Sequence, residues 1–376
     1  MTFTTRPLVL LLWLLTACGE PGVRGGDRSR PSSPSRSFDA LFELEARIDL
    51  EEPDSGLIIG VPGIDVDAGG RLLVPEPVLA EVRVYSPGGR LLQRLGRRGD
   101  GPGEFRRPLA AAFAPDGSVY VTDAGVPRIT RFTPSLAFDT VFPLQSAYFA
   151  AQIEPVPEGL VVFAMREGPD ARLYDVYSSR GELRVSFHAM HPLIRSVPGW
   201  IAAARSNLAV GAGHIYIAEN LLYPFARYDL AGRLVDSLGT PPPSWTAASR
   251  PEPGAFQGAD AWTRFQRWRR TFTTISGLGI YRDSLLLVVH KTLDPRVVAY
   301  EESHYRLDLY RLGAELRKLA QDIVLPGPLL HAGEKVYILL AAPPETERWT
   351  LGRYRLWESV ESLSRDAPLR LSEVAE

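Results

Sequence analysis

The chain has 376 residues, of which 45% are hydrophobic and 23% are charged, and its formal net charge is −2. This composition excludes a mainly disordered chain, and the near-neutral charge excludes a global field that would attract nucleic acid or acidic membranes. The 33 glycines and 32 prolines follow no collagen-like period, so we expect them to serve turns between regular elements.

The first 17 residues predict a signal peptide. Arg6 precedes an apolar run at 8–15, which is too short for a helix that spans a bilayer. The run ends in Leu15-Thr-Ala-Cys18, which resembles the bacterial lipobox, and Cys18 is the only cysteine of the chain. The resemblance implies cleavage before Cys18 and acylation of its thiol by palmitate-type chains, which excludes a disulfide. An ordinary signal peptide with a chance cysteine is the alternative.

The resemblance also implies a location. Gly19 follows the cysteine where an aspartate would favour the inner membrane. We therefore expect a protein anchored at Cys18 in the bacterial cell envelope, in the outer membrane, facing the periplasm or the exterior. Residues 18–37 are rich in Gly, Pro, Ser and Arg, and predict a flexible tether that follows the lipidated cysteine.

The segment 99–132 has the clearest internal pattern. A glycine-rich turn leads to an apolar strand and the turn Pro115-Asp-Gly117, and a Val/Tyr strand, Asp123-Ala-Gly125 and an alternating strand follow. This order resembles an NHL repeat, which is one four-stranded blade of a β-propeller. The glycines of these turns supply the positive φ that tight hairpins require.

This segment is the second of six repeats and extends over 108–142, and looser forms of its pattern recur at 64–92, 158–181, 211–235, 282–310 and 333–357. Six recurrences predict an all-β fold, a six-bladed β-propeller of four-stranded antiparallel blades over 38–357. The last repeat is one strand short, and the alternating segment 38–48 is expected to supply that strand and close the ring. Two stacked β-sandwiches are the alternative, and residues 358–376 are expected to form a polar tail.

Two segments predict a contact surface on the face that carries the loops from second to third strands and from blade to blade, here called the top face. Ligands of propellers usually meet this face, as the family resemblance implies. The first segment is the connection 97–107, together with an arginine that faces it across blade two. Its candidate residues are Arg98, Glu104, Phe105, Arg106 and Arg128. The alternative is a structural role, as the ordinary linker of an NHL repeat.

The second segment is an insertion at 240–272, between blades four and five. Trp262, Phe265, Trp268 and Arg269 follow the spacing of one helical face. We expect a helix across the top face with its aromatic side chains inward and arginines outward. Clustered aromatic and arginine side chains are typical of binding hot spots. The alternative is that the aromatic residues plug the mouth of the channel as local core.

The six histidines do not predict one metal site. His214 and His331 lie near first turns of their blades and His290 lies at the opposite end of a second strand. Strand length separates these levels by roughly 15 Å, so each histidine is expected to be a satisfied polar residue. The family resemblance leaves a second possibility, a metal-dependent hydrolase of lactonase type with a divalent ion at the channel mouth. Its candidate ligands are Glu76, Asp123, Glu219 and Asn220.

No Gly-x-Ser-x-Gly motif occurs in the chain. We therefore expect a non-catalytic binding scaffold for a protein, peptide or glycan at the bacterial envelope. No cofactor and no nucleic-acid partner are expected, and a divalent metal is expected only if the chain is a hydrolase.

Overall fold

The computed structural model describes residues 37–51, 63–145, 149–166, 168, 170–197, 206–293, 303–341 and 348–357. The predicted signal peptide, the lipidation site Cys18, the tether up to residue 36 and the tail 358–376 lie outside these residues.

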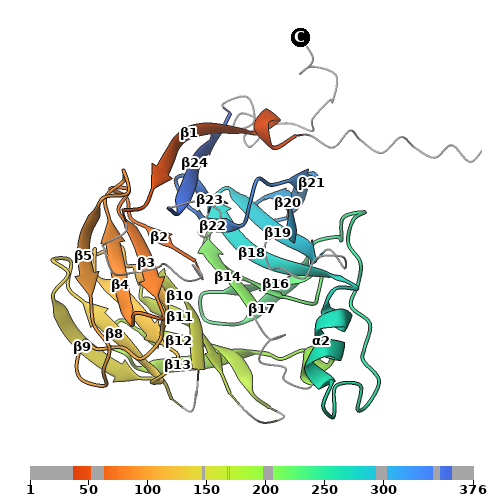
Figure 1. Cartoon of the computed structure of the whole chain (residues 1–376), viewed down its shortest axis with the longest axis horizontal. Helices are drawn as coiled ribbons and strands as arrows, with labels where there is room; N and C mark the ends of the chain where they lie inside the picture. Colours follow the sequence, from red (N-terminus) through yellow and green to blue (C-terminus); the bar gives the residue numbers. More distant parts are fainter. Residues whose placement is uncertain are drawn as a thin grey trace, which may run out of the picture. The chain divides into compact units, whose positions relative to one another are not determined.

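The described residues form six four-stranded antiparallel sheets that follow one another around a ring (Figure 1). Blade one contains β2 (Asp65–Val66), β3 (Leu72–Glu76), β4 (Glu81–Tyr85) and β5 (Leu91–Leu95). Blade two contains β6 (Pro108–Phe113), β7 (Val119–Asp123), β8 (Arg128–Phe132) and β9 (Phe138–Pro143). Blade three contains β10 (Phe149–Val156), β11 (Gly159–Met165), β12 (Arg172–Ser178) and β13 (Leu183–Ala189).

Blade four contains β14 (Ser206–Gly211), β15 (His214–Glu219), β16 (Phe225–Asp229) and β17 (Leu234–Leu238). Blade five contains β18 (Thr273–Tyr281), β19 (Leu285–Leu293), β20 (Ser303–Arg311) and β21 (Arg317–Val324). Blade six contains β22 (Leu329–Ala332), β23 (Val336–Ala341), β24 (Thr350–Leu356) and β1 (Phe42–Asp49). Six recurrences in the sequence thus correspond to six blades, so the predicted six-bladed β-propeller is confirmed and the two-sandwich alternative is wrong.

The N-terminal strand closes the ring, as predicted. β1 pairs antiparallel with β24, from Phe42 opposite Leu356 to Asp49 opposite Thr350. Phe42 is buried and its ring stacks on Phe38 of the 3₁₀ turn η1 (Phe38–Ala40), with 4.7 Å between the ring centroids. Just after β1, the amide of Glu51 donates to the carbonyl of Gly89 in blade one at 2.8 Å. The strand therefore joins the last blade to the first.

The core lies between neighbouring blades. The second strands β3, β7 and β11 are buried along their whole length, because both of their faces meet another sheet. One apolar cluster joins Leu73 and Val84 of blade one to Ala111 and Phe113 of blade two. Each fully buried aliphatic or aromatic side chain stabilises the fold by about 1.5–3 kcal/mol. Sheets that bury both faces give a rigid ring, and the ends of their strands present the loops.

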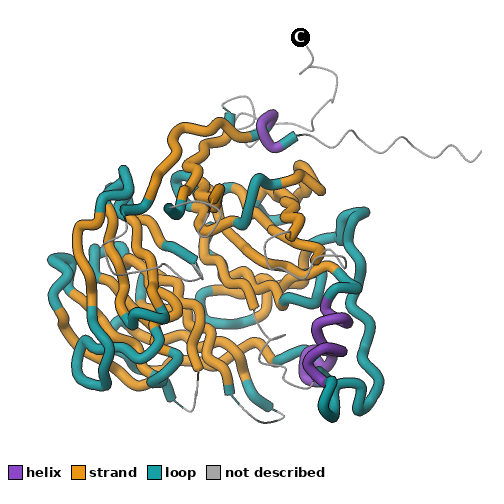
Figure 2. Tube along the Cα trace, in the orientation of Figure 1, coloured by secondary structure: helices purple, strands orange, loops and turns teal. Residues whose placement is uncertain are grey.

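The structure describes two α-helices, both short: α1 (Pro192–Arg195) and α2 (Ala261–Arg269). Figure 2 shows how few helical segments accompany the strands. The helix predicted within 240–272 is confirmed as α2. Neither described helix has the length and apolar character needed to cross a membrane.

Candidate functional site

The connection 97–107 is held by its own contacts. Asp123 at the end of β7 is fully buried, and its carboxylate accepts the amides of Arg106, Arg107 and Gly125 at 2.7–2.8 Å. Arg106 forms a two-point ion pair with Asp100 at 2.5 and 2.6 Å. Three charge-assisted bonds on one buried carboxylate fix the end of this loop against the blade.

The other candidates in this connection also contact the protein itself. Phe105 is fully buried in the core between blades one and two. Arg128 donates to the carbonyls of Asp100, Gly101 and Glu104. Glu104 pairs with Arg97 at 2.9 Å, and Arg98 donates to the carbonyl of Val78. These contacts give the connection a structural explanation, and Phe105 in particular offers no surface to a ligand.

The insertion divides its aromatic residues between core and solvent. Phe265 is buried and Trp268 is partly buried, and both pack on apolar side chains of blades three and four. Trp262 is 64% exposed, so the prediction that it points inward with them is wrong. Arg269 lies over the Phe265 ring, 5.8 Å from its centroid. Trp262 lies in the first turn of α2, and the buried face of the helix begins at Phe265, about one turn later.

The helix α2 lies at the outer edge of the ring in Figure 1 rather than over its centre. The cavity in the central channel has a volume of about 200 Å³ and is lined by residues of the innermost strands and the segments beside them, β2, β6, β10, β14, β18 and β22. The aromatic residues of the insertion therefore extend the core between blades three and four instead of plugging the channel.

The four residues proposed for a lactonase-type metal site do not come together. Glu76 is fully buried near Arg83 in blade one, while Asp123 is used by its loop. Glu219 accepts from the His188 ring at 3.0 Å, and Asn220 accepts from the side chain of Asn207 at 3.2 Å. Within the described part of the chain, the three carboxylates form no common group with metal-binding geometry. A hydrolase built on these four residues is therefore not supported.

The histidines differ in part from expectation. His188 lies in β13 with φ of +62°, and besides Glu219 its ring contacts the Tyr228 hydroxyl at 2.9 Å. His331 lies on β22 and its Nδ1 is 3.3 Å from Asp65 Oδ1. His290 departs from the prediction of a satisfied polar residue, since it is buried and neither ring nitrogen forms a hydrogen bond.

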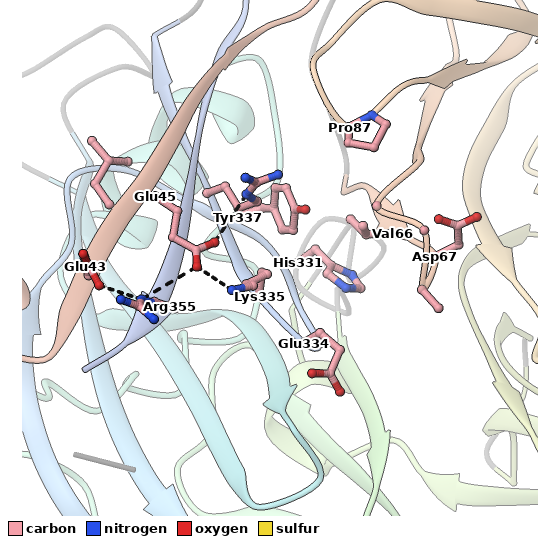
Figure 3. Close-up of a pocket in the computed structure, with 16 residues that line it drawn as sticks. Glu43, Glu45, Val66, Asp67, Pro87, His331, Glu334, Lys335, Tyr337 and Arg355 are labelled. Carbon is pink, nitrogen blue, oxygen red and sulfur yellow. Dashed lines mark hydrogen bonds and ion pairs between the residues drawn. The ribbon is translucent and has the colours of Figure 1, made fainter. Parts of the chain in front are cut away.

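A cleft of about 930 Å³ opens where blade six meets blade one. Figure 3 shows Glu43, Glu45 and Arg355 on the blade-six side, Val66, Asp67 and Pro87 on the blade-one side, and His331 between them. The volume lies near the upper end of the range found for ligand pockets, about 300–1,000 Å³. This size and this lining make the cleft the candidate binding site.

The blade-six wall of the cleft contains a network of ion pairs. Glu45 on β1 lies 2.5 Å from Lys335 and 3.5 Å from Arg353 (Figure 3), and Glu43 accepts from Arg355 at 2.6 Å. These side chains remain 21–39% exposed. Ion pairs in such contact with water contribute little stability, so their charges can exchange partners with a charged ligand at small cost.

His331 lines both the cleft and the central channel, where it lies beside Asp65, and Glu154 lines the same channel cavity. Burial raises the pKa of Glu154 on β10 to about 8, and the nearby charge of Asp65 adds to the effect. Burial also raises the pKa of Asp65 and lowers the pKa of His331, although each group partly offsets the shift of the other. At neutral pH the channel therefore holds a protonated Glu154 and a neutral imidazole beside Asp65.

Sequence reasoning missed the cleft. No motif marks it, because its walls come from the first strand of the fold, the last blade and a turn of blade one. One signal was available. Glu43 and Glu45 alternate along the segment predicted to close the ring, and Arg353 and Arg355 alternate along the strand it was expected to join. Alternation places each pair on one face of the sheet.

No family model matches the sequence, and no curated protein matches it. Many solved structures are similar in fold, among them two proteins of Bacteroides. A protein of Bacteroides fragilis, named as an exported protein, has a TM-score of 0.56 and 13% identity, over 86% of this chain and 97% of that chain. A member of the duf4221 family from Bacteroides vulgatus has a TM-score of 0.57 and 10% identity, over 85% of this chain and 99% of that chain. Similarity at this level of identity establishes the shared fold.

Proposed function

We propose that this chain is a non-catalytic binding propeller of the bacterial envelope, held on a membrane by acyl chains at Cys18. The lipobox-like end of the signal peptide supports the anchor, and the fold is shared with a protein that is named as exported. Two or three acyl chains bind a bilayer stably, at about 0.8 kcal/mol for each buried CH₂ group. The outer membrane is proposed because Gly19 follows the cysteine.

We further propose that the blades are NHL repeats, on the evidence of the turn and strand order at 99–132. Asp123 supports this assignment, since it ties the blade-to-blade linker to the end of a second strand. In this view the connection 97–107 and the insertion add rigidity, and binding belongs to the cleft.

The observation that carries the proposal is the cleft between blades six and one. It offers a ligand exposed charges of both signs, a tyrosine and an imidazole within about 930 Å³. A short peptide segment of a partner protein matches this lining best, because its backbone supplies donors and acceptors and its side chains supply both charges. A glycan supplies hydroxyl groups but no cation to meet the acidic residues Glu43, Glu45, Asp67 and Glu334.

The test is a binding screen of the purified protein against a library of mixed-charge peptides and, in parallel, a glycan array. We expect peptide binding with a Kd on the order of micromolar, and at least about tenfold weaker binding after Arg355→Glu, which reverses one wall charge and costs on the order of 1.4 kcal/mol. Trp262→Ala, at an exposed position outside the cleft, should bind as the wild type does.

Three results would count against the proposal. Binding that survives Arg355→Glu unchanged would move the site elsewhere, and binding lost in Trp262→Ala would move it to the insertion. Selective binding of glycans would replace the proposed ligand class.

A further inference from the structure

A second cluster of polar side chains lies within the sheet of blade five, away from the ends of β19 and β20. It contains His290 on β19, Asp308 on β20 and Asp322 on β21. Val288 is paired with Asp308 and His290 with Arg306, so His290 and Asp308 are diagonal neighbours on one face of the sheet. The β20–β21 pairing is irregular between Leu307 and Leu309, and Asp322 there has φ of +56°.

The three side chains converge. Nε2 of His290 is 3.5 Å from Oδ1 of Asp308 and 3.8 Å from Oδ1 of Asp322. The three candidate ligand atoms all lie within 4.8 Å of one another. Ligand atoms bound tetrahedrally at about 2.1 Å from one ion are separated by about 3.4 Å, so a small inward shift would place all three around a cation.

His290 is the independent sign of a missing ligand. Its side chain is 1% exposed, and neither ring nitrogen has a hydrogen-bond partner. Buried polar groups in proteins are nearly always hydrogen-bonded. A cation would satisfy Nε2, which already points between the two carboxylates.

The carboxylate of Asp308 is held in place by its hydrogen bonds. Oδ2 of Asp308 accepts from the Tyr223 hydroxyl at 2.8 Å and lies 3.3 Å from Lys318 Nζ, and Oδ1 accepts the Asp322 amide at 2.9 Å.

The insertion covers this cluster. Ser244 donates its hydroxyl to Oδ1 of Asp322 and its amide to Oδ2 at 3.3 Å. The Trp245 ring meets the His290 ring edge to face, with 6.3 Å between centroids. A cation at this point would therefore link blade five to the start of the insertion.

We propose that His290, Asp308 and Asp322 bind one divalent transition-metal ion of the zinc class. An imidazole ligand favours zinc over calcium and magnesium, which prefer oxygen ligands only. Three protein ligands leave a fourth position open. The ammonium of Lys318 competes for the same negative charge, so the affinity is expected to be moderate.

The test is a metal titration of the purified protein after treatment with a chelator, with Zn²⁺ and Ca²⁺ in separate experiments. We expect about one Zn²⁺ per chain, no comparable binding of Ca²⁺, and an increase in Tm with Zn²⁺. His290→Gln and Asp322→Asn should weaken zinc binding at least about tenfold. His304→Gln, at an exposed histidine of the same strand as Asp308, is the matched control and should bind as the wild type does.

Lys318→Met gives a second, opposite readout. Removing the competing ammonium should tighten zinc binding, because the Lys318 side chain lies 3.3 Å from Asp308 and is 21% exposed. The proposal is overturned if the wild type binds no zinc, or if His290→Gln and Asp322→Asn bind as tightly as the His304→Gln control. If His290→Gln does not fold, Asp322→Asn and Lys318→Met decide the matter. Because this site is separate from the cleft, its failure would leave the proposed peptide binding intact.

Discussion

The carboxyl groups of this protein have different roles that depend on the groups surrounding them. Asp123 accepts three backbone amides and organises a loop, whereas Glu154 lines the channel, where burial raises its pKa to about 8 so that it keeps its proton at neutral pH. Both side chains end in a carboxyl group, and the surrounding groups determine whether that group is charged or protonated.

Asp123→Ala should destabilise the fold strongly. The substitution leaves the amides of Arg106, Arg107 and Gly125 without their acceptor, and each lost bond costs on the order of 1 kcal/mol or more. We expect the free energy of unfolding, measured by urea denaturation, to fall by about 2–4 kcal/mol. Asp139→Ala, at an exposed position of the same blade, is the control and should change it by less than about 1 kcal/mol. Equal effects of the two would remove the structural role of Asp123.

Glu154 predicts a pH dependence. Its pKa is about 8 in the folded protein against an ordinary 4.5, so the folded state holds the proton more tightly than the unfolded state. The stability that this proton supplies is complete below about pH 4.5 and is lost as the pH rises through about 8. Glu154→Gln removes this dependence. The Tm of the variant minus the Tm of the wild type should therefore become more positive as the pH rises from about 5 to about 9.

Calorimetry at several pH values measures this difference. Glu158→Gln changes an exposed glutamate next to the same hairpin, and its difference from the wild type should stay flat. A flat profile for Glu154→Gln as well would show that Glu154 titrates normally.

At the scale of elements, the sequence was most informative where local chemistry determines structure. Turn glycines and alternating strands identified six blades, and the alternating segment 38–48 identified the closing strand, because both depend on neighbours in the chain. The prediction that Trp262 points inward was wrong because helical spacing is compatible with more than one buried face. Only the packing against blades three and four determines that Phe265 and Trp268 lie on the buried face.

The sites were least predictable because they join distant strands. The cleft needs β1, blade six and a turn of blade one, and the cluster at His290 needs three strands and the insertion. A β-bulge also moves Asp322 out of simple register, which a strict two-residue alternation does not anticipate.

The closing strand should be essential for stability. Phe42→Ala removes a buried ring that stacks on Phe38 and belongs to the apolar core between blades five and six, which is expected to cost about 3–5 kcal/mol. Leu44→Ala changes a side chain of the same strand that is 41% exposed, and it should cost about 1 kcal/mol or less. Denaturant unfolding compares the two. Similar costs would mean that β1 contributes little to ring closure.

At the scale of the whole molecule, the proposed anchor determines where the propeller works. Cys18→Ala should abolish labelling by palmitate and transfer the protein from the membrane fraction to the soluble fraction, because the acyl chains are lost. Gly19→Asp keeps the cysteine and should remain labelled and membrane-bound. Membrane association of Cys18→Ala equal to that of the wild type would refute the lipid anchor.

The ring also explains how a rigid scaffold can present a cleft. Every blade packs on its neighbours through buried apolar clusters, and β1 pairs with β24 of the last blade and leads into the first blade. The cleft lies where the last blade meets the first. A ligand there would contact side chains on strands whose positions are already fixed, and such preorganisation lowers the entropic cost of binding.

Photo-crosslinking determines whether ligands bind in the cleft. A photoreactive amino acid replaces either Glu334, which lines the cleft, or Glu158, which lies at the corresponding turn of blade three; both side chains are 79% exposed. With a peptide selected in the binding screen, we expect crosslinked product from position 334 and none above background from position 158. Equal crosslinking at both positions, or crosslinking at 158 alone, would contradict it.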